Sequence, residues 1–471
     1  MTIPRVWPKQ LDDIWAKSAD KGAGGKPETL VEHTWSVLEK LAELIQLRPF
    51  LPQQIGVPRL WNCLFWAVFL HDFGKAAQGF QSRLRPGGER WKHRHEVLSL
   101  AFIYWVAGVF SPDELVWVIA AIVSHHRDAD EIQRSYNSIG DPDELVLHSL
   151  VDELDNNTLR NLWQWISDYS ADWIRQLGLD VEGVISPDLP SQDAAIHMVR
   201  ESGVVFIRRC LKRYHRWLER NVNQSDDPSL LIGAIALRGH IISSDHMASA
   251  HVGQLPASQL TNAEELTSRL NLTQLYDHQR ECLSVRGSAV LMAPTGSGKT
   301  EAALLWAVSQ AQPDHPVPRL FYTLPFQASM NAMQMRLNED EHDRKAAFTG
   351  QVGLEHSRST LAYYRRLLEE DYTPQSALKA ARWSRNLAQL NYFPVRVLSP
   401  YQLLKAPYRL KGYETLLTDC FDAAFILDEI HAYEAERLAK ILATVKYLRV
   451  HYSARFVENI TFQYPLSDRT H

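Results

Sequence analysis

The spacing of apolar residues changes character near residue 253. Between residues 28 and 252, apolar side chains recur at steps of three and four residues. This periodicity predicts helices over 30–47, 60–72, 96–110, 113–126 and 229–250. Alternation typical of strands is rare in this half. The pattern therefore predicts an all-helical N-terminal domain, residues 1–252.

Residues 253–272 are polar, contain a proline and are typical of a linker. Beyond them, short β-rich runs at 288–294, 318–325, 393–400 and 423–429 alternate with helical patterns. That alternation is typical of a parallel α/β sheet. We expect a multidomain α and α/β protein whose second domain occupies residues 273–471.

The amino-acid composition is that of a globular protein and excludes several other classes. A chain of 471 residues with 45% hydrophobic and 22% charged residues is ordinary for a globular protein. The net charge of −5 excludes a uniformly basic nucleic-acid binder. The 4 cysteines are far apart and suit a reducing compartment. The apolar run Leu98–Phe110 is too short to cross a bilayer, and no signal peptide is visible, so we expect a cytoplasmic protein without a membrane anchor.

The helix predicted over 60–72 ends in an unusual way. It is apolar from Leu64 to Leu70, and then His71 and Asp72 follow at once. Burying a neutral polar group without a hydrogen bond costs roughly 2–7 kcal/mol. Burying a carboxylate beside an imidazole therefore also costs several kcal/mol unless both groups find partners. Gly74 is placed to act as the C′ cap of this helix.

Other polar residues interrupt apolar helices of the same domain. Taken singly, each histidine is explained best as a hydrogen-bonded core residue. Taken together, five imidazoles and two carboxylates favour bound cations, and such a donor set suits Mn, Fe, Co, Ni or Zn better than Mg alone. The full set of candidate metal ligands is His33, His71, Asp72, His95, His125, His126 and Asp245.

The order H…HD…H…HH…D resembles the HD superfamily of metal-dependent phosphohydrolases. The adjacent His125 and His126, with the H-D-x-G-K form of residues 71–75, are similar to the HD nuclease domain of the CRISPR-associated nuclease-helicases of type I systems. The resemblance implies two ions that share Asp72. One is held with His33, His71 and Asp245, and the other with His95, His125 and His126. His93 competes with His95, but the spacing from His95 to Ser99 favours His95.

Two such ions generate hydroxide at neutral pH and stabilise both oxygens of an in-line phosphodiester displacement. Asp72 is the candidate catalytic carboxylate because only a carboxylate bridges two cations while lowering their repulsion. Lys75 is a candidate for holding a phosphate oxygen or the leaving group. An exposed helix-end lysine favoured by the helix dipole is an equally good explanation of Lys75.

The second domain carries a phosphate-binding loop. The segment "LMAPTGSGKTEAALLWA" follows a predicted strand and opens a helix, as a Walker A loop requires. The loop residues Thr295, Gly296, Ser297 and Gly298 turn backbone N–H groups towards phosphate. Lys299 would neutralise the β- and γ-phosphates of ATP, and Thr300 would offer its hydroxyl to Mg²⁺.

A second motif, "FILDEIHAY", completes this site. Its strand delivers Asp428 to Mg²⁺ and Glu429 to the attacking water, and His431 couples the site to nucleic acid. The D-E-x-H form resembles superfamily 2 helicases, which implies one RecA-like lobe. Gln279 matches the glutamine with which that family reads adenine. Residues 324–333 and 397–404 resemble motifs Ia and Ib, and residues 353–359 resemble an insert typical of the nuclease-helicases.

Residues 207–220 form a basic cluster with a single glutamate. A helix of this composition can follow DNA phosphates, but a solvated face explains it better.

These features predict a metal-dependent single-stranded DNA endonuclease fused to the ATP-binding lobe of a helicase. By resemblance, a type I RNA-guided surveillance complex recruits it to degrade target DNA. No second helicase lobe is recognisable, so we expect that the chain alone does not unwind DNA unless a separate chain supplies that lobe. The alternatives are an HD phosphohydrolase acting on small nucleotides and a truncated, non-catalytic binding module.

Overall fold

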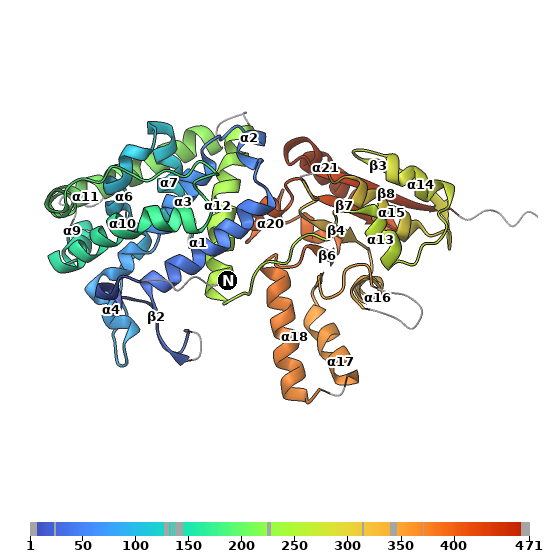
Figure 1. Ribbon diagram of the computed structural model, residues 1–471, viewed down its shortest axis with the longest axis horizontal. Coiled ribbons are helices and arrows are strands. Elements are labelled where there is room, and N and C mark those ends of the chain that lie inside the picture. The colour runs from blue at the N-terminus through green and yellow to red at the C-terminus, as the bar shows by residue number, and fades with distance from the viewer. Residues whose placement is uncertain are drawn as a thin grey trace, which may run out of the picture. The chain divides into compact units, whose positions relative to one another are not determined.

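The computed structural model describes residues 7–22, 25–126, 131–132, 134, 136, 145–223, 228–312, 315–339, 346–370 and 372–462. The chain divides into two compact units, Met1–Gly253 and Gln254–His471 (Figure 1). Residues 463–471, which the sequence assigns to the second domain, lie outside the described residues.

The first unit is helical, as the periodicity predicts. A short antiparallel pair, β1 (Trp15–Lys17) and β2 (Glu28–Thr29), precedes its helices. The longer helices are α1 (Leu30–Leu47), α3 (Leu60–Leu70), α7 (Pro112–Ser124), α10 (Asn156–Gln176), α11 (Gln192–Trp217) and α12 (Pro228–Ser249). The shorter ones are α2 (Leu51–Gln54), α4 (Gln78–Leu84), α5 (His95–Ser99), α6 (Ile103–Val106) and α9 (Leu145–Asp152).

Two helices, α1, which carries His33, and α7, which His125 directly follows, begin at capping boxes. The Thr29 hydroxyl accepts from the Glu32 amide at 3.2 Å, and the Glu32 carboxylate accepts from the Thr29 amide at 2.9 Å. Ser111 and Glu114 form the same reciprocal pair at the start of α7. Each box satisfies amides that would otherwise lack partners and fixes where its helix begins.

Helix α3 forms the centre of the helical unit. Every side chain from Leu60 to Leu70 is buried, which is expected for a helix that is apolar on all sides. It packs against α1, α7 and α12. Phe69 near its end contacts the rings of Trp165 and Trp173 of α10. The end of α3 therefore delivers the next two residues, His71 and Asp72, into the interior.

The expectation that Gly74 caps α3 is wrong. Gly74 lies in a 3₁₀ turn, Phe73–Ala76, and has no left-handed backbone conformation. Its role is close approach, because a Cβ atom at this position would lie 2.0 Å from the carbonyl oxygen of His95. The Gly74 amide donates to Ser99 Oγ at 2.9 Å, and Ser99 Oγ donates to the His71 carbonyl at 2.7 Å. Gly74 thus lets α5 pack against the turn that holds Asp72.

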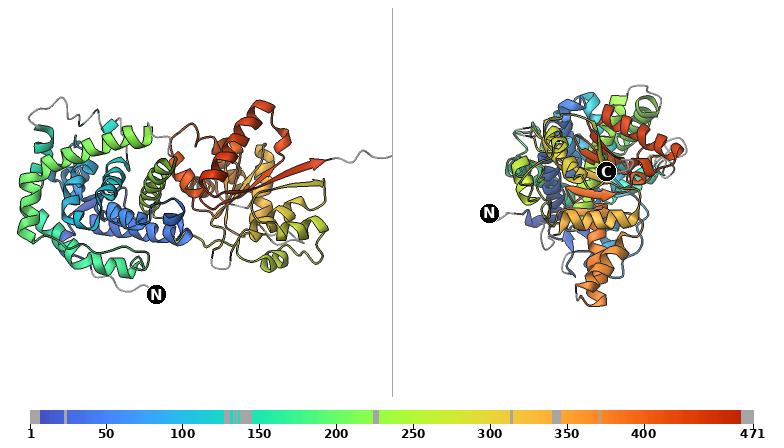
Figure 2. Two further views of the ribbon diagram at one scale, coloured as in Figure 1. Left: turned by 90° about the horizontal axis from the view of Figure 1, so that it is seen from above. Right: turned by 90° about the vertical axis from the view of Figure 1, so that its right-hand side faces the viewer.

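The second unit is an α/β lobe with a parallel sheet of 6 strands in the order β3-β8-β7-β4-β6-β5. Figure 2 shows α21 on one side of this sheet and the helices of residues 263–309 on the other. The strands are β3 (Ala289–Pro294), β4 (Leu320–Thr323), β5 (Val352–Glu355), β6 (Val395–Leu398), β7 (Ala424–Asp428) and β8 (Arg455–Phe462). The helices are α13 (Ala263–Arg269), α14 (Asp277–Ser284), α15 (Lys299–Ser309), α16 (Gln327–Asn338), α17 (Ser359–Glu369), α18 (Pro374–Gln389), α19 (Pro400–Leu403), α20 (Tyr413–Asp419) and α21 (Ala435–His451).

The lobe differs from the sequence expectation in two respects. Strands β5 and β8 were not predicted, and β5 lies largely inside the stretch taken as a family insert. The stretch 253–272 is not simply a linker, because it contains α13, and Leu260, Leu266 and Leu270 belong to the core of the lobe. In the part of the chain that the structure describes, no helix is both long and apolar enough to cross a membrane.

We predict that Gly74→Ala destabilises the helical unit by about 2 kcal/mol, because overpacking against a backbone carbonyl forces α5 and the turn apart. Tryptophan fluorescence during urea unfolding measures this, since Trp306 and Trp383 are the only ones of the 14 tryptophans outside the first unit. Gly108→Ala is the control, because a Cβ there meets nothing within 4 Å. Equal stability of the two variants would contradict the packing role of Gly74.

A second prediction concerns the N-cap of α10, where Asp155 accepts from the Thr158 amide at 2.6 Å. Burial acts to raise the pKa of Asp155, but the hydrogen bonds from Thr158 outweigh it and lower that pKa. Asp155→Ala should cost about 1 kcal/mol at neutral pH. Because the folded pKa is depressed, this difference should vanish as the pH falls through it. Asp155→Asn should retain most of the stability, and a loss as large as that of the alanine variant would refute capping.

Candidate metal centre and nucleotide-binding loop

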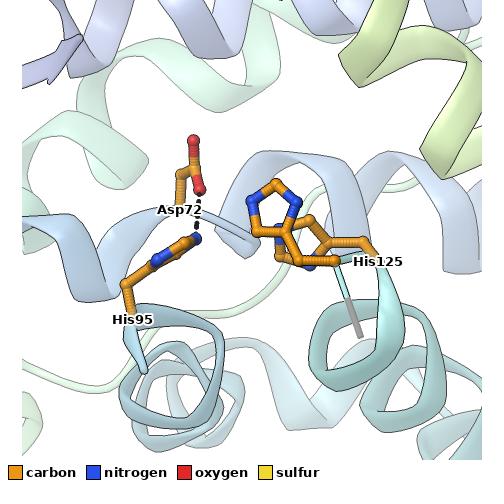
Figure 3. Close-up of side chains that lie close together, drawn as sticks. Asp72, His95 and His125 are labelled. Carbon is orange, nitrogen blue, oxygen red and sulfur yellow. Dashed lines mark ion pairs between the residues drawn. The ribbon is translucent and has the colours of Figure 1, made fainter. Parts of the chain in front are cut away.

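The predicted metal ligands of the helical unit converge on one region, although they come from distant parts of the chain. His126 lies at the exposed side of this region. Their ligand atoms form two groups, in each of which all atoms lie within 4.8 Å of one another. Figure 3 shows His95 directed at Asp72, with His125 facing the same space from a neighbouring helix. The groups are Asp72, His95, His125 and His126, and His33, His71 and Asp245.

Asp72 lies between the two groups and presents one oxygen to each. Its Oδ2 atom lies 3.3 Å from both His33 Nε2 and His71 Nε2. Its Oδ1 atom lies 3.1 Å from His95 Nε2. Asp245 Oδ1 approaches His33 Nε2 to 3.3 Å from the opposite side. The carboxylate of Asp72 is therefore positioned to bridge two cations.

The buried imidazoles turn the same nitrogen towards the centre. His71 Nδ1 lies 2.6 Å from the Val68 carbonyl, and His125 Nδ1 lies 2.6 Å from the Ile122 carbonyl. Because a carbonyl only accepts, Nδ1 carries the proton in both rings. The lone pair of a neutral ring is then on Nε2, which faces the centre, as in histidines that bind metals.

Two carboxylates do the same for the rings of His33 and His95. His33 Nδ1 lies 3.2 Å from Glu28 Oε1, and Lys17 pairs with the other Glu28 oxygen at 2.7 Å. His95 Nδ1 lies 3.4 Å from Glu96 Oε2. Glu28 and Glu96 are buried, and the sequence analysis missed both. An acidic residue five positions before His33 and one directly after His95 were the available signals.

The interior-facing atoms fit a cation. Among the described residues, none forms a hydrogen bond with Asp72 Oδ1 or with the Nε2 atoms of His33, His71, His95 and His125, and all these atoms are buried. Asp72 Oδ2 pairs with Lys75 Nζ at 2.6 Å. Such atoms are expensive to bury without partners. Imidazole nitrogens and carboxylate oxygens are the donors that Mn, Fe, Co, Ni and Zn accept, so the residues suit these ions.

Burial and neighbouring charges have opposite effects on the pKa values of the two carboxylates at the centre. Burial acts to raise the pKa of Asp72, but the charges of His71 and Lys75 outweigh it and hold that pKa well below its ordinary value. For Asp245, a hydrogen bond and the charge of His33 likewise outweigh burial and lower the pKa. His126 is exposed to solvent on one side, but the desolvation of its ring by its neighbours, with the His95 charge, lowers the pKa of His126 to about 3. The carboxylates are therefore ionised and His126 is neutral, as ligands must be.

Lys75 is buried rather than exposed at a helix end, and its Nζ atom lies 2.6 Å from Asp72 Oδ2. This position is compatible with a role at the centre. His93, the competitor of His95, belongs to neither group, and its Nε2 atom faces Ser149 Oγ at 3.4 Å. The basic cluster of α11 exposes Arg209, Lys212 and Arg216 to solvent, which agrees with a solvated face.

The phosphate-binding loop of the second unit lies between β3 and α15. Gly296 and Gly298 both have φ of 77°, a conformation that glycine adopts readily and that turns amides towards a common point. Thr295 and Ser297 lie in the same turn, and Ser297 Oγ donates to the Pro294 carbonyl at 2.8 Å. Lys299 and Thr300 open α15.

Side chains of this loop make internal contacts. Lys299 Nζ donates to the Ala293 and Pro294 carbonyls at 3.0 and 3.2 Å. Gln279 is buried, accepts from the Tyr276 amide at 3.0 Å and donates to the Gly298 carbonyl at 3.2 Å. Gln279 therefore joins the start of α14 to the loop.

Asp428 is the last residue of β7. In the sheet, β8 lies between β7 and β3, the strand that precedes the phosphate-binding loop. Tyr322, missed from the sequence, donates its hydroxyl to Asp428 Oδ2 at 2.6 Å. Burial and the Glu429 charge raise the pKa of Asp428. Glu429 has a left-handed backbone with φ of 54°, and its carboxylate lies 2.9 Å from His431 Nε2.

Comparisons with known proteins agree with this division. Residues 15–206 match the family described as Cas3, HD domain, and residues 276–460 match the DEAD/DEAH box helicase family. The CRISPR-associated nuclease/helicase Cas3 of Methanothermobacter thermautotrophicus is 25% identical over 82% of this chain and 46% of its own. A putative Cas3 of Methanocaldococcus jannaschii is 23% identical over 81% of this chain and 51% of its own.

The fold has solved counterparts. The crystal structure of T. fusca Cas3-ATP covers 95% of this chain and 50% of that chain, with a TM-score of 0.50 and 18% identity. The T. fusca Cas3-ADP structure gives the same values. This chain thus spans about half the length of the curated relatives. The first unit therefore carries a Cas3-type HD domain and the second carries one lobe of a DEAD/DEAH box helicase domain, and the chain is similar to the Cas3 nuclease/helicases over about half of their length.

Proposed function

We propose that this chain is a metal-dependent endonuclease for single-stranded DNA, joined to an ATP-binding helicase lobe. The observation that carries the proposal is the position of Asp72, which offers one carboxylate oxygen to each of two groups of imidazoles. We infer that His33, His71 and Asp245 hold one divalent cation and that His95, His125 and His126 hold another. Both share Asp72.

When bound, two divalent cations supply a hydroxide nucleophile and neutralise charge on the displaced oxygen. The residues of the chain then have three tasks. Asp72 keeps the two groups together. The Val68 and Ile122 carbonyls, with Glu28 and Glu96, hold the imidazole tautomers that expose Nε2. Lys75 donates to a non-bridging phosphate oxygen of the substrate.

A single strand is the proposed substrate because one strand reaches a recessed centre more easily than a duplex does. In the family context, a type I RNA-guided surveillance complex would present the displaced strand of the target. In the lobe, the loop 295–300 would hold the phosphates of ATP, Asp428 would bind Mg²⁺ and Glu429 would orient water. Gln279 would read adenine. The helicase proposal is limited to nucleotide binding by this lobe.

The nuclease proposal is tested on circular single-stranded DNA with Mn²⁺, Co²⁺, Ni²⁺ or Mg²⁺ and without ATP. We expect cleavage by the wild type and at least a hundredfold loss in Asp72→Ala, because the shared ligand is gone. Metal content, measured by mass spectrometry, should fall in the same variant. Asp168→Ala, an exposed aspartate on α10, is the control and should cleave normally.

Cleavage of nucleoside triphosphates but not of DNA would favour a small-nucleotide phosphohydrolase instead. Absence of both metal and cleavage in the wild type would contradict an enzymatic HD domain.

We further predict that Glu28→Ala weakens Mn²⁺ binding by roughly 10–100-fold, because His33 loses the acceptor that orients its ring. Equilibrium dialysis against Mn²⁺ measures the change. Glu28→Gln keeps an acceptor oxygen and should retain affinity better than the alanine variant. Identical affinities for the wild type and Glu28→Ala would show that Glu28 does not position His33.

A further inference from the structure

A basic segment lies directly before His95 and has no role in the centre described above. Residues 83–94, here called the basic loop, run from the last residues of α4 to the start of α5. The loop contains Arg83, Arg85, Arg90, Lys92 and Arg94, and its single acidic residue is Glu89.

The basic loop encloses a hollow of about 770 Å³. Its walls are held by contacts with the rest of the helical unit. Trp91 Nε1 donates to Glu153 at 2.9 Å, and the Arg94 amide donates to the Tyr136 hydroxyl at 2.7 Å. A Cβ at Gly88 would lie 1.9 Å from the Ser82 carbonyl oxygen, so the loop returns tightly on itself. The hollow is therefore formed before any ligand binds. Its lining residues are Arg83, Gly88, Glu89, Arg90, Trp91, Lys92, His93 and Arg94.

Four of the five cations of the loop divide into two kinds. Arg85 donates to the Asp13 carbonyl at 2.9 Å, and Arg94 pairs with Glu131 at 3.3 Å, so both have structural partners. Arg90 and Lys92 are exposed, and no residue in the described ranges forms an ion pair with either. Their charges are available to an anion from outside.

Phe80 joins the hollow to the metal centre. Its ring lies 5.4 Å from the ring of Trp91, which lines the hollow, and 5.4 Å from the ring of His95. Lys75 Nζ lies 6.0 Å from the same ring, on the side of the centre. The guanidinium of Arg83, at the other end of the loop, lies 5.7 Å from it. An anion in the hollow is thus one aromatic ring away from the candidate ligand His95.

We propose that the basic loop binds the phosphodiester backbone of the single strand whose next phosphate lies at the metal centre, with Arg90 and Lys92 as its phosphate contacts. This inference rests on the proposed nuclease function. It assigns a role in substrate positioning to Arg90 and Lys92, which are not among the candidate metal ligands. A nucleic-acid strand fits because it carries regularly spaced charge and extends from the hollow to the centre.

The test uses the full chain with Arg90→Ala and Lys92→Ala combined. Binding of a fluorescein-labelled single-stranded oligonucleotide is followed by anisotropy in EDTA over a range of salt concentrations. Cleavage is followed separately with Mn²⁺. Arg160→Ala combined with Arg175→Ala, two exposed arginines of α10, is the charge-matched control.

We expect the slope of log K against log salt to become shallower by about 1.4 in the loop variant, since each single-strand phosphate contact contributes roughly 0.7. KM for cleavage should rise about tenfold, with kcat much less affected. The control should match the wild type.

Suppose that the wild type cleaves DNA and that the loop variant has the same salt dependence and the same KM as the wild type. That result would overturn the loop assignment alone. An equal loss in the α10 control would also overturn it, because the effect would then reflect net charge. If the wild type does not cleave DNA with any metal, the proposed function fails first.

Discussion

The helical unit depends on the burial of one carboxylate. Asp72 is 1% exposed and faces imidazoles on two sides at 3.1 and 3.3 Å. An ionised carboxylate is tolerated in such a place only when opposite charge or metal compensates for lost hydration. Lys75 compensates in part, at 2.6 Å from Oδ2. Because the buried helix α3 ends directly before His71 and Asp72, it places the Asp72 carboxylate among the inward Nε2 atoms.

The surrounding residues orient the side chains that face this carboxylate. Carbonyls at the ends of α3 and α7 fix the rings of His71 and His125, because each ring donates its Nδ1 proton to a carbonyl in the turn of helix directly before it. Gly74 allows α5 to approach closely enough for His95 to reach Asp72. The basic loop lies directly before His95 in the sequence. Helix ends, a close glycine contact and a charged loop are thus parts of one arrangement around Asp72.

The sequence predicted the elements with strong periodicity, and it selected ligand candidates because histidines and aspartates interrupted apolar stripes. It did not single out Glu28 or Glu96, although each lies close in sequence to the histidine that it contacts. It could not predict Tyr322, since only tertiary packing brings this residue to Asp428. Gly74 was misread because a glycine after a helix is commonly a cap, whereas here the neighbouring chain requires it. β5 was not predicted because Val352–Glu355 is short and contains a glycine. β8 was not predicted because charged residues interrupt its apolar pattern.

The central claim is that Asp72 joins two cation sites. The most direct measurement is anomalous diffraction at the manganese edge from crystals of the chain grown with Mn²⁺. The account predicts two peaks that both adjoin Asp72, one beside His33, His71 and Asp245 and the other beside His95, His125 and His126. Density that showed no ion at Asp72, with manganese only at surface carboxylates, would contradict it.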